Sequence, residues 1–310
     1  MRTVLIRVAA VALALALAVG VTACGGGDAV QGSGAEIVVS SNILGDVVHQ
    51  LVGNLASVET LMPPNTDPHE FSASARQAAD MRSAQVLVVN GLGFESGLAD
   101  AISAAQHDGV KVIQVAPLAP RLRTIDEDGT GTPVTDPHVF TDPSRMAGAV
   151  GALASRLSDA VPALDTDAFR TRAQDYVRRL HALDADVQRI LAPIPAARRV
   201  LVTNHDALGY FAERYGFRVL GAVIPSLSTL AAPSAADLAD LAEAIQRSGV
   251  PAVFADTSSP KRLSAALARE GHGVKVVTLF VESLGAKGSG AATYEDMVRT
   301  NARRIARALG

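Results

Sequence analysis

Short apolar runs alternate with longer stretches of helical periodicity over most of this chain. In the first half, runs rich in Val, Ile and Leu cover 37–40, 58–62, 86–90 and 110–115, and helical stretches cover 43–55, 72–83 and 94–107. The second half repeats the plan, with apolar runs at 200–203, 217–223, 252–255 and 274–279 and helical stretches at 207–215, 234–248, 260–270 and 294–309. Such alternation is typical of parallel sheets with crossover helices. It predicts an α/β fold of two similar lobes, each with a parallel sheet flanked by helices.

A long amphipathic helix is predicted between the two halves. Its apolar positions recur alternately four and three residues apart, at Phe169, Ala173, Tyr176, Leu180, Leu183, Val187 and Ile190. At 1.5 Å per residue the helix measures roughly 40 Å, long enough to run beside both lobes. Pro162 precedes it, and Pro193 and Pro195 end it. A coiled-coil seam is the alternative, but the flanking α/β segments favour one long helix that joins the lobes.

The start of the chain has the features of a secretion signal. Arg2 and Arg7 precede an apolar run over 8–21, which is shorter than the roughly 20 residues that a membrane-spanning helix needs. We expect a signal peptide at 1–23 and a flexible tether at 24–35. The remaining length of about 275 residues suits two domains better than one core. The predicted divisions are an N-terminal lobe at 36–162, the linking helix at 163–193 and a C-terminal lobe at 194–310.

Cys24 is the only cysteine, so an intramolecular disulfide is excluded. The stretch Val21-Thr22-Ala23-Cys24 resembles the bacterial lipoprotein box, in which the signal is cut before a cysteine that is then acylated. Ordinary cleavage, which leaves a free thiol, is the alternative. Since a Gly-rich stretch follows at once, we favour lipidation of Cys24. The expected location is the extracytoplasmic face of the cell membrane, in the periplasm or cell envelope.

Composition narrows the choice of partners. The net charge of -3 and the pI near 6.2 show no basic excess, so nucleic acid is not expected as a partner. Aromatic residues make up only 4% of the chain, which argues against a large aromatic-lined pocket for an organic solute. We expect a monomer.

One hexapeptide pattern occurs twice, as Thr66-Asp67-Pro68-His69-Glu70-Phe71 and as Thr135-Asp136-Pro137-His138-Val139-Phe140. Proline fixes its own φ and favours extended geometry in the preceding aspartate. Each histidine is therefore presented from a stiff, non-helical turn. Rigid presentation suits a metal ligand, whose nitrogen must lie about 2.0 to 2.1 Å from zinc.

A third candidate ligand, His205, follows the apolar run 199–203 after one intervening residue. Ligands of open α/β sheets bind beyond the carboxyl ends of the strands, where His69 and His205 are both predicted to lie. The other histidines have no such setting and are interpreted as structural or exposed: His49, His107, His181 and His272.

A fourth ligand is expected from the second lobe. Glu282 lies just beyond the apolar run that ends at Leu279, and Asp256 ends the run at 252–255. Either carboxylate can approach a metal between the lobes or orient a histidine that binds it. At this point both carboxylates remain candidates.

These segments together resemble a known family. The two DPH turns, Asp136 to Pro143, Thr203 to Ala207 with Tyr210-Phe211, and Glu282 to Gly285 are similar, in order and spacing, to the zinc and manganese solute-binding lipoproteins of ABC importers, in their zinc-binding branch. The resemblance implies metal bound between two lobes and delivered to a membrane permease. It places the metal ligands at His69, His138, His205 and Glu282.

Three departures from the family pattern stand out. Aspartate is usual at the position of Glu282. The longer glutamate leaves three arrangements open, namely monodentate binding, binding through a water molecule, or replacement of Glu282 by Asp256 as the ligand, and Glu282 is favoured. The His-rich loop of many zinc-specific members is missing from 120–135, where the acidic stretch 126–129 stands instead. Phe140 replaces the family's tryptophan.

Three imidazoles and one carboxylate favour Zn²⁺ over Mn²⁺, which prefers oxygen ligands. The expected function is high-affinity zinc capture for an ABC importer, with the permease and a metal-loading chaperone as candidate partners and a manganese-binding transport protein as an alternative. A zinc-dependent hydrolase with Glu70 as general base is the other alternative. The chain lacks HExxH, P-loop and Gly-x-Ser-x-Gly motifs, so we expect no enzyme activity.

Overall fold

The computed structural model describes residues 36–126, 131–259, 262–270 and 274–310. The predicted signal peptide, the tether with Cys24, His272 and residues 127–129 of the acidic stretch lie outside the described residues. The described part falls within one compact unit, residues 32–310. None of its helices has the length and apolar character needed to cross a membrane.

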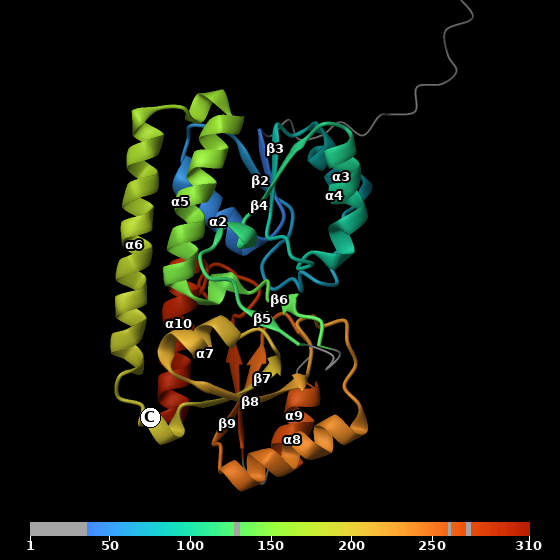
Figure 1. Cartoon of the computed structure of the whole chain (residues 1–310), viewed down its shortest axis with the longest axis vertical. Helices are drawn as coiled ribbons and strands as arrows, with labels where there is room; N and C mark the ends of the chain where they lie inside the picture. The colour runs from blue at the N-terminus through green and yellow to red at the C-terminus, as the bar shows by residue number, and fades with distance from the viewer. Residues whose placement is uncertain (1–35, 127–130, 260–261, 271–273) are drawn as a thin grey trace, which may run out of the picture. The chain divides into compact units, whose positions relative to one another are not determined.

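The N-terminal sheet is parallel throughout, in the order β2-β1-β3-β4. Its strands are β1 (Ile37–Val39), β2 (Val58–Thr60), β3 (Val86–Val89) and β4 (Lys111–Gln114). The associated helices are α2 (Asn42–Val52), α3 (Ala75–Ser83), α4 (Ala99–His107) and α5 (Pro143–Ala160). Both β1 and β3 are completely buried, as expected of strands covered on both faces. We call this part the N lobe (Figure 1).

The C-terminal sheet is also parallel, in the order β10-β9-β7-β8. Its strands are β7 (Val200–His205), β8 (Arg218–Ile224), β9 (Ala252–Asp256) and β10 (Lys275–Leu279). Its helices are α7 (Gly209–Tyr215), α8 (Ala235–Ser248), α9 (Arg262–Glu270) and α10 (Tyr294–Leu309). We call this part the C lobe. A short antiparallel hairpin, β5 (Thr124–Ile125) with β6 (Val134–Thr135), leads into the second DPH turn.

Several 3-10 turns connect these elements. They are η1 (Ser96–Leu98), η2 (Ala116–Leu118), η3 (Val139–Thr141), η4 (Pro162–Leu164) and η5 (Ala196–Arg198).

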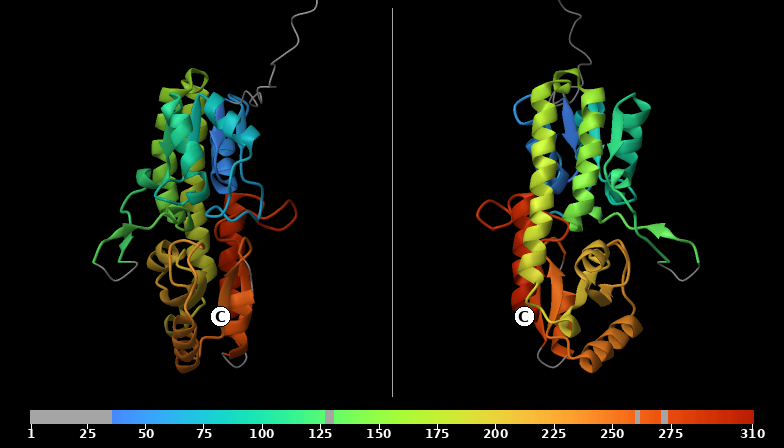
Figure 2. Two further views of the ribbon diagram at one scale, coloured as in Figure 1. Left: turned by 90° about the vertical axis from the view of Figure 1, so that its right-hand side faces the viewer. Right: turned by 60° about the vertical axis from the view of Figure 1, so that its left-hand side comes forward.

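The long helix α6 (Asp167–Leu191) runs beside both lobes (Figures 1 and 2). It begins where the Thr166 hydroxyl accepts a hydrogen bond from the Phe169 amide, which satisfies a free donor of the first turn. Its apolar face packs on α5, α2 and α10. The predicted α/β class, with two parallel sheets and one linking helix, is confirmed.

One apolar core runs through both lobes. The same buried cluster includes Val39 of β1, Tyr176 of α6, Phe254 of β9 and Tyr294 of α10. A densely packed interior resists continuous deformation. We therefore expect only small movements of one lobe against the other.

The buried face of α6 also carries a carboxylate. Asp184 accepts hydrogen bonds from Arg214 Nε at 2.9 Å and from the Tyr215 hydroxyl at 3.0 Å, which ties the linking helix to α7. Burial alone raises the pKa of Asp184, but these hydrogen bonds outweigh burial and hold its pKa below the ordinary 3.8.

Asp184→Ala is expected to lower the free energy of unfolding at pH 7 by about 1–3 kcal/mol, because Tyr215 and Arg214 lose their partner. Because the pKa of Asp184 is lower in the folded state than in the unfolded state, its carboxylate stabilises the fold at pH values above the unfolded-state pKa. This contribution is lost as the pH falls through the folded-state pKa. The difference from wild type should therefore shrink in urea titrations below about pH 4. Asp175→Ala, an exposed change on the same helix, should stay within about 0.5 kcal/mol. Equal effects of the two changes contradict the role of Asp184.

Candidate metal centre

His69 is presented by the first DPH turn, after β2. Asn65 adopts a left-handed φ of 61° at the start of this turn, a conformation that asparagine tolerates better than most residues. Asp67 Oδ1 accepts a hydrogen bond from the His69 amide at 3.0 Å. The imidazole is 2% exposed, and its Nδ1 has no hydrogen-bond partner among the described residues.

His138 is held more firmly, although its turn has the same sequence pattern. Asp136 Oδ1 accepts from the His138 amide at 2.9 Å and from Nδ1 at 2.8 Å, while Oδ2 accepts from Arg123 Nη1 at 2.8 Å. Because the Asp136 carboxylate is only an acceptor, Nδ1 must carry the proton. The Nε2 lone pair of a neutral His138 is therefore directed away from Asp136 and is available to a cation.

His205 is the last residue of β7. The sequence had predicted that it lies just beyond the strand. The strand continues because β8 pairs with it up to Ile224, which lies opposite His205. The Thr203 hydroxyl donates to the His205 carbonyl at 2.8 Å. The imidazole therefore lies at the carboxyl edge of the C-lobe sheet, and it is 1% exposed.

Glu282 enters from the segment between β10 and α10. Its Oε1 lies 2.9 Å from His69 Nε2, 3.0 Å from His138 Nε2 and 3.1 Å from His205 Nε2. The ligand atoms of the four side chains all lie within 4.8 Å of one another, and all four side chains are buried. Among the described residues this is the one group of His, Cys, Asp and Glu side chains that converges in this way.

The charges of this group depend on one another. Burial raises the pKa of Glu282, but the imidazoles, His205 first, outweigh burial and hold that pKa well below its usual range. Burial lowers the pKa of His138, but the hydrogen bonds to Asp136 and Glu282 raise it to about 10. A carboxylate oxygen among three Nε2 atoms thus requires positive charge close by, from protons or from a metal ion.

Unsatisfied polar atoms show that the donor set fits a cation. His205 Nε2 and Glu282 Oε2 are buried and have no hydrogen-bond partner among the described residues. The 3.1 Å contact of His205 with Glu282 is close enough for charge attraction but lacks hydrogen-bond geometry. Buried atoms of this kind are costly unless something pairs with them. A metal ion bound by His69, His138, His205 and Glu282 would do so.

Asp256 lies outside the convergent group. Its Oδ2 accepts from the Ser258 hydroxyl at 2.7 Å, and its Oδ1 accepts from the Val281 amide at 3.1 Å. The carboxylate is therefore occupied in fixing the residue before Glu282. Burial, and then the charge of Glu282, raise its pKa.

Phe94 forms one wall of the cluster. Its ring meets His69 edge-on at 5.2 Å and His138 at 5.9 Å between ring centroids, and Phe140 packs behind it at 5.3 Å. Glu95 fixes this wall, because its Oε1 accepts from the Ser40 hydroxyl and from the Asn90 amide, both at 2.6 Å. Apolar walls keep water from the four polar side chains and strengthen electrostatic attraction to a cation.

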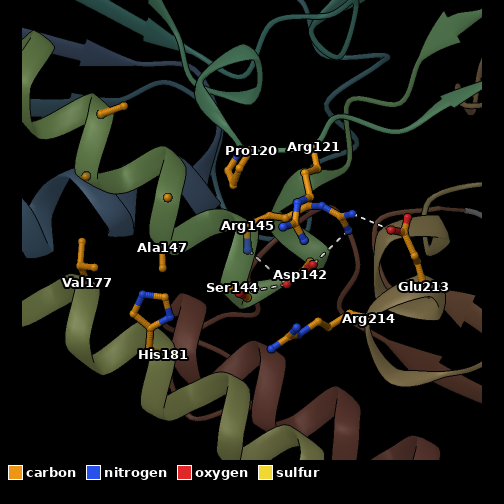
Figure 3. Close-up of a pocket in the computed structure, with 13 residues that line it drawn as sticks. Pro120, Arg121, Asp142, Ser144, Arg145, Ala147, Val177, His181, Glu213 and Arg214 are labelled. Atoms are coloured by element: carbon orange, nitrogen blue, oxygen red, sulfur yellow. Dashed lines mark hydrogen bonds and ion pairs between the residues drawn. The ribbon is translucent and has the colours of Figure 1, made fainter.

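The other polar candidates are placed away from this cluster. Glu70 is exposed beside the buried His69, and His49, His107 and His181 are exposed on α2, α4 and α6. His181 lines a surface cavity of about 690 Å³ between α5, α6 and α7 (Figure 3). Figure 3 shows Arg145 in that cavity directed at Asp142 and at Glu213. None of the four convergent side chains lines it.

Comparisons with known proteins agree with the fold. The model of the family "Zinc-uptake complex component A periplasmic" matches residues 37–308. The zinc-binding protein TroA of Treponema pallidum is 33% identical over 93% of this chain and 92% of that protein. The manganese-binding lipoprotein MntA of Bacillus subtilis is 32% identical over 93% of this chain and 95% of that protein. The solved structure of Treponema pallidum TroA superimposes with a TM-score of 0.82 at 31% identity, over 89% of this chain and 99% of that one.

The two-lobe fold and the similarity to these proteins identify the chain as a metal-binding substrate-binding protein of an ABC transporter. The chain belongs to the family of the periplasmic zinc-uptake component A. Its relatives are solute-binding transport proteins and not enzymes, so the hydrolase alternative is set aside.

Proposed function

We propose that this protein captures one Zn²⁺ between its lobes and delivers it to the membrane permease of an ABC importer. His69, His138, His205 and Glu282 are the proposed ligands. The observation that supports this most strongly is the convergence of three Nε2 atoms on one oxygen of a buried carboxylate. Bound zinc would hold the four side chains together. His69 and His138 lie in the N lobe, and His205 and Glu282 lie in the C lobe.

The donor set supports zinc over manganese. The names of the relatives do not decide this, because one names zinc and another names manganese. Three imidazoles with one carboxylate suit zinc, whereas manganese prefers more oxygen ligands. Elemental analysis of the protein purified from its native envelope tests the choice. About one zinc per chain is expected, and manganese in its place contradicts the proposal.

We also propose that Cys24 carries a lipid anchor on the extracytoplasmic face of the membrane. The support is the lipoprotein-like stretch before Cys24 and the relatives named as lipoproteins. Labelled palmitate should be incorporated into the wild type and not into Cys24→Ser. Equal labelling of both rules out the anchor.

Zinc binding is expected to weaken as pH falls, because protons and the metal compete for the same imidazole Nε2 atoms. The raised pKa of His138 means that this imidazole is protonated at pH 7 before metal arrives. Binding at pH 7 should therefore release about one proton, and the affinity should fall about tenfold per pH unit. Calorimetry in two buffers of different ionisation enthalpy counts the protons. Release of none contradicts the proposed ligation by His138.

A further inference from the structure

The segment that carries Glu282 belongs to the C lobe but is hydrogen-bonded to the N lobe. Asn42, at the start of α2, accepts from the Leu284 amide at 2.7 Å through Oδ1. Its Nδ2 donates to the Ser283 hydroxyl at 2.8 Å and to the Pro63 carbonyl at 2.8 Å. One neutral side chain thus connects both residues that follow Glu282 with the N lobe.

Ser283 extends this connection toward the first DPH turn. Its hydroxyl oxygen also accepts from the Thr66 amide at 3.1 Å, and the Asn65 amide donates to the Leu284 carbonyl at 3.0 Å. Residues 63–66 lead directly to His69. The contacts of Asn42 and Ser283 therefore fix two segments together, one that carries Glu282 and one that leads to His69.

These hydrogen bonds are made out of water. Asn42 is 8% exposed and Ser283 is fully buried, and removal of one partner leaves the other unsatisfied in a low dielectric. Asn42 also stands on a helix whose first turn is capped by Ser41. A side chain on a rigid element holds its neighbours more precisely than one on a loop.

Glu282 depends on such support. Its Oε2 has no hydrogen-bond partner among the described residues, and its Oε1 meets only the three imidazoles. Apart from the imidazoles, no hydrogen-bond partner among the described residues orients the carboxylate, so its position depends on the backbone of its own segment. Asp256 holds the residue before Glu282 from the C lobe, and Asn42 holds the two residues after it from the N lobe.

We propose that Asn42 and Ser283 form an interlobe latch: they are positioning residues that hold Glu282 against the three imidazoles and slow the dissociation of the bound divalent cation. This inference rests on the proposed zinc capture. Removal of the latch leaves all four ligands in the chain but allows the Glu282 segment to leave the N lobe.

Stopped-flow mixing of zinc-loaded protein with excess chelator measures the dissociation rate. Asn42→Ala and Ser283→Ala are each expected to raise that rate about 10- to 100-fold, the range found when the partner that orients a metal ligand is removed. The double variant should exceed the faster single variant by no more than about threefold, because the two residues share one hydrogen bond.

Asn301→Ala is the matched control. Asn301 also makes two backbone hydrogen bonds to this segment, to the Phe280 amide at 2.9 Å and to the Phe280 carbonyl at 2.7 Å, but it does so from α10 in the same lobe. Its loss should lower thermal stability and change the dissociation rate by less than about threefold. An acceleration equal to that of Asn42→Ala overturns the latch, because general loosening of the segment then explains both.

The same substitution in a variant that lacks Glu282 distinguishes positioning of Glu282 from a general effect on stability. In Glu282→Ala, the further change Asn42→Ala should alter zinc dissociation by less than about twofold, because the group that the latch positions is gone. An undiminished effect there overturns the latch. If the wild type binds zinc but Asn42→Ala and Ser283→Ala leave the zinc dissociation rate unchanged, the latch is overturned and the proposed function is not. A wild type that binds no zinc overturns the proposed function together with the latch.

Discussion

His205→Ala is expected to weaken zinc binding about 100- to 1,000-fold, because one of four proposed ligands is lost and protein zinc sites with four ligands bind with about 10–16 kcal/mol in total. His205 is the proposed imidazole ligand of the C lobe, so its loss leaves Glu282 as the proposed ligand from that lobe. Competition titration against a chelator of known affinity measures the change.

The control for this prediction is His181→Ala. His181 is exposed on α6 and lines the surface cavity of Figure 3 rather than the cluster. Its replacement should leave zinc affinity unchanged, while circular dichroism shows that both variants fold. If His205→Ala binds zinc as tightly as the wild type, His205 is not a ligand.

Asp136→Asn is expected to weaken zinc binding about 10- to 100-fold, because metal-bound histidines depend on the carboxylate that accepts from their second ring nitrogen. Asp136 bonds both the amide and Nδ1 of His138, and Arg123 pairs with its other oxygen. Asparagine lacks the negative charge that makes this hydrogen bond strong. The same competition titration measures the loss.

The equivalent change in the first turn supplies the comparison. Asp67 accepts a hydrogen bond from the His69 amide, and His69 Nδ1 has no hydrogen-bond partner among the described residues. Asp67→Asn keeps an acceptor for that amide, so its effect should stay below about threefold. Equal losses in the two variants contradict the proposed difference between the turns.

Much of the fold was predictable from local patterns. The apolar runs that form β1, β3, β7 and β9 are short, buried and bounded by helical stretches. On α6 the buried residues follow the predicted four-and-three spacing, except that at its end Leu191 is buried and Ile190 is half-buried. Element ends were less predictable. The stretch predicted as a helix from 72 begins at Ala75, because Ser74 and Gln77 form a reciprocal cap.

Another predicted helix, over 94–107, is divided. Glu95 turns inward to accept from Ser40, Asn90 and Gly91, so a 3-10 turn precedes α4. Nothing in the local sequence distinguishes that buried carboxylate from an exposed one. Its partners lie on the ends of β1 and β3, and only the assembled sheet brings them together.

The proposed site was only partly predictable for the same reason. The repeated DPH turns and the position of His205 after an apolar run identify three side chains, and the resemblance adds Glu282. The contacts that distinguish these side chains are distant in sequence. Arg123 lies 13 residues from Asp136, and Asn42 lies 241 residues from Ser283. No local pattern in the sequence links such pairs, so the support of His138 and the proposed latch can be recognised only in the folded chain.

X-ray absorption at the zinc edge of the loaded protein tests the proposed site most directly. Three imidazole nitrogens and one carboxylate oxygen at about 2.0–2.2 Å are expected, with one imidazole lost in His205→Ala. A zinc shell with fewer than three imidazoles, or one that His205→Ala leaves unchanged, contradicts metal capture by His69, His138, His205 and Glu282.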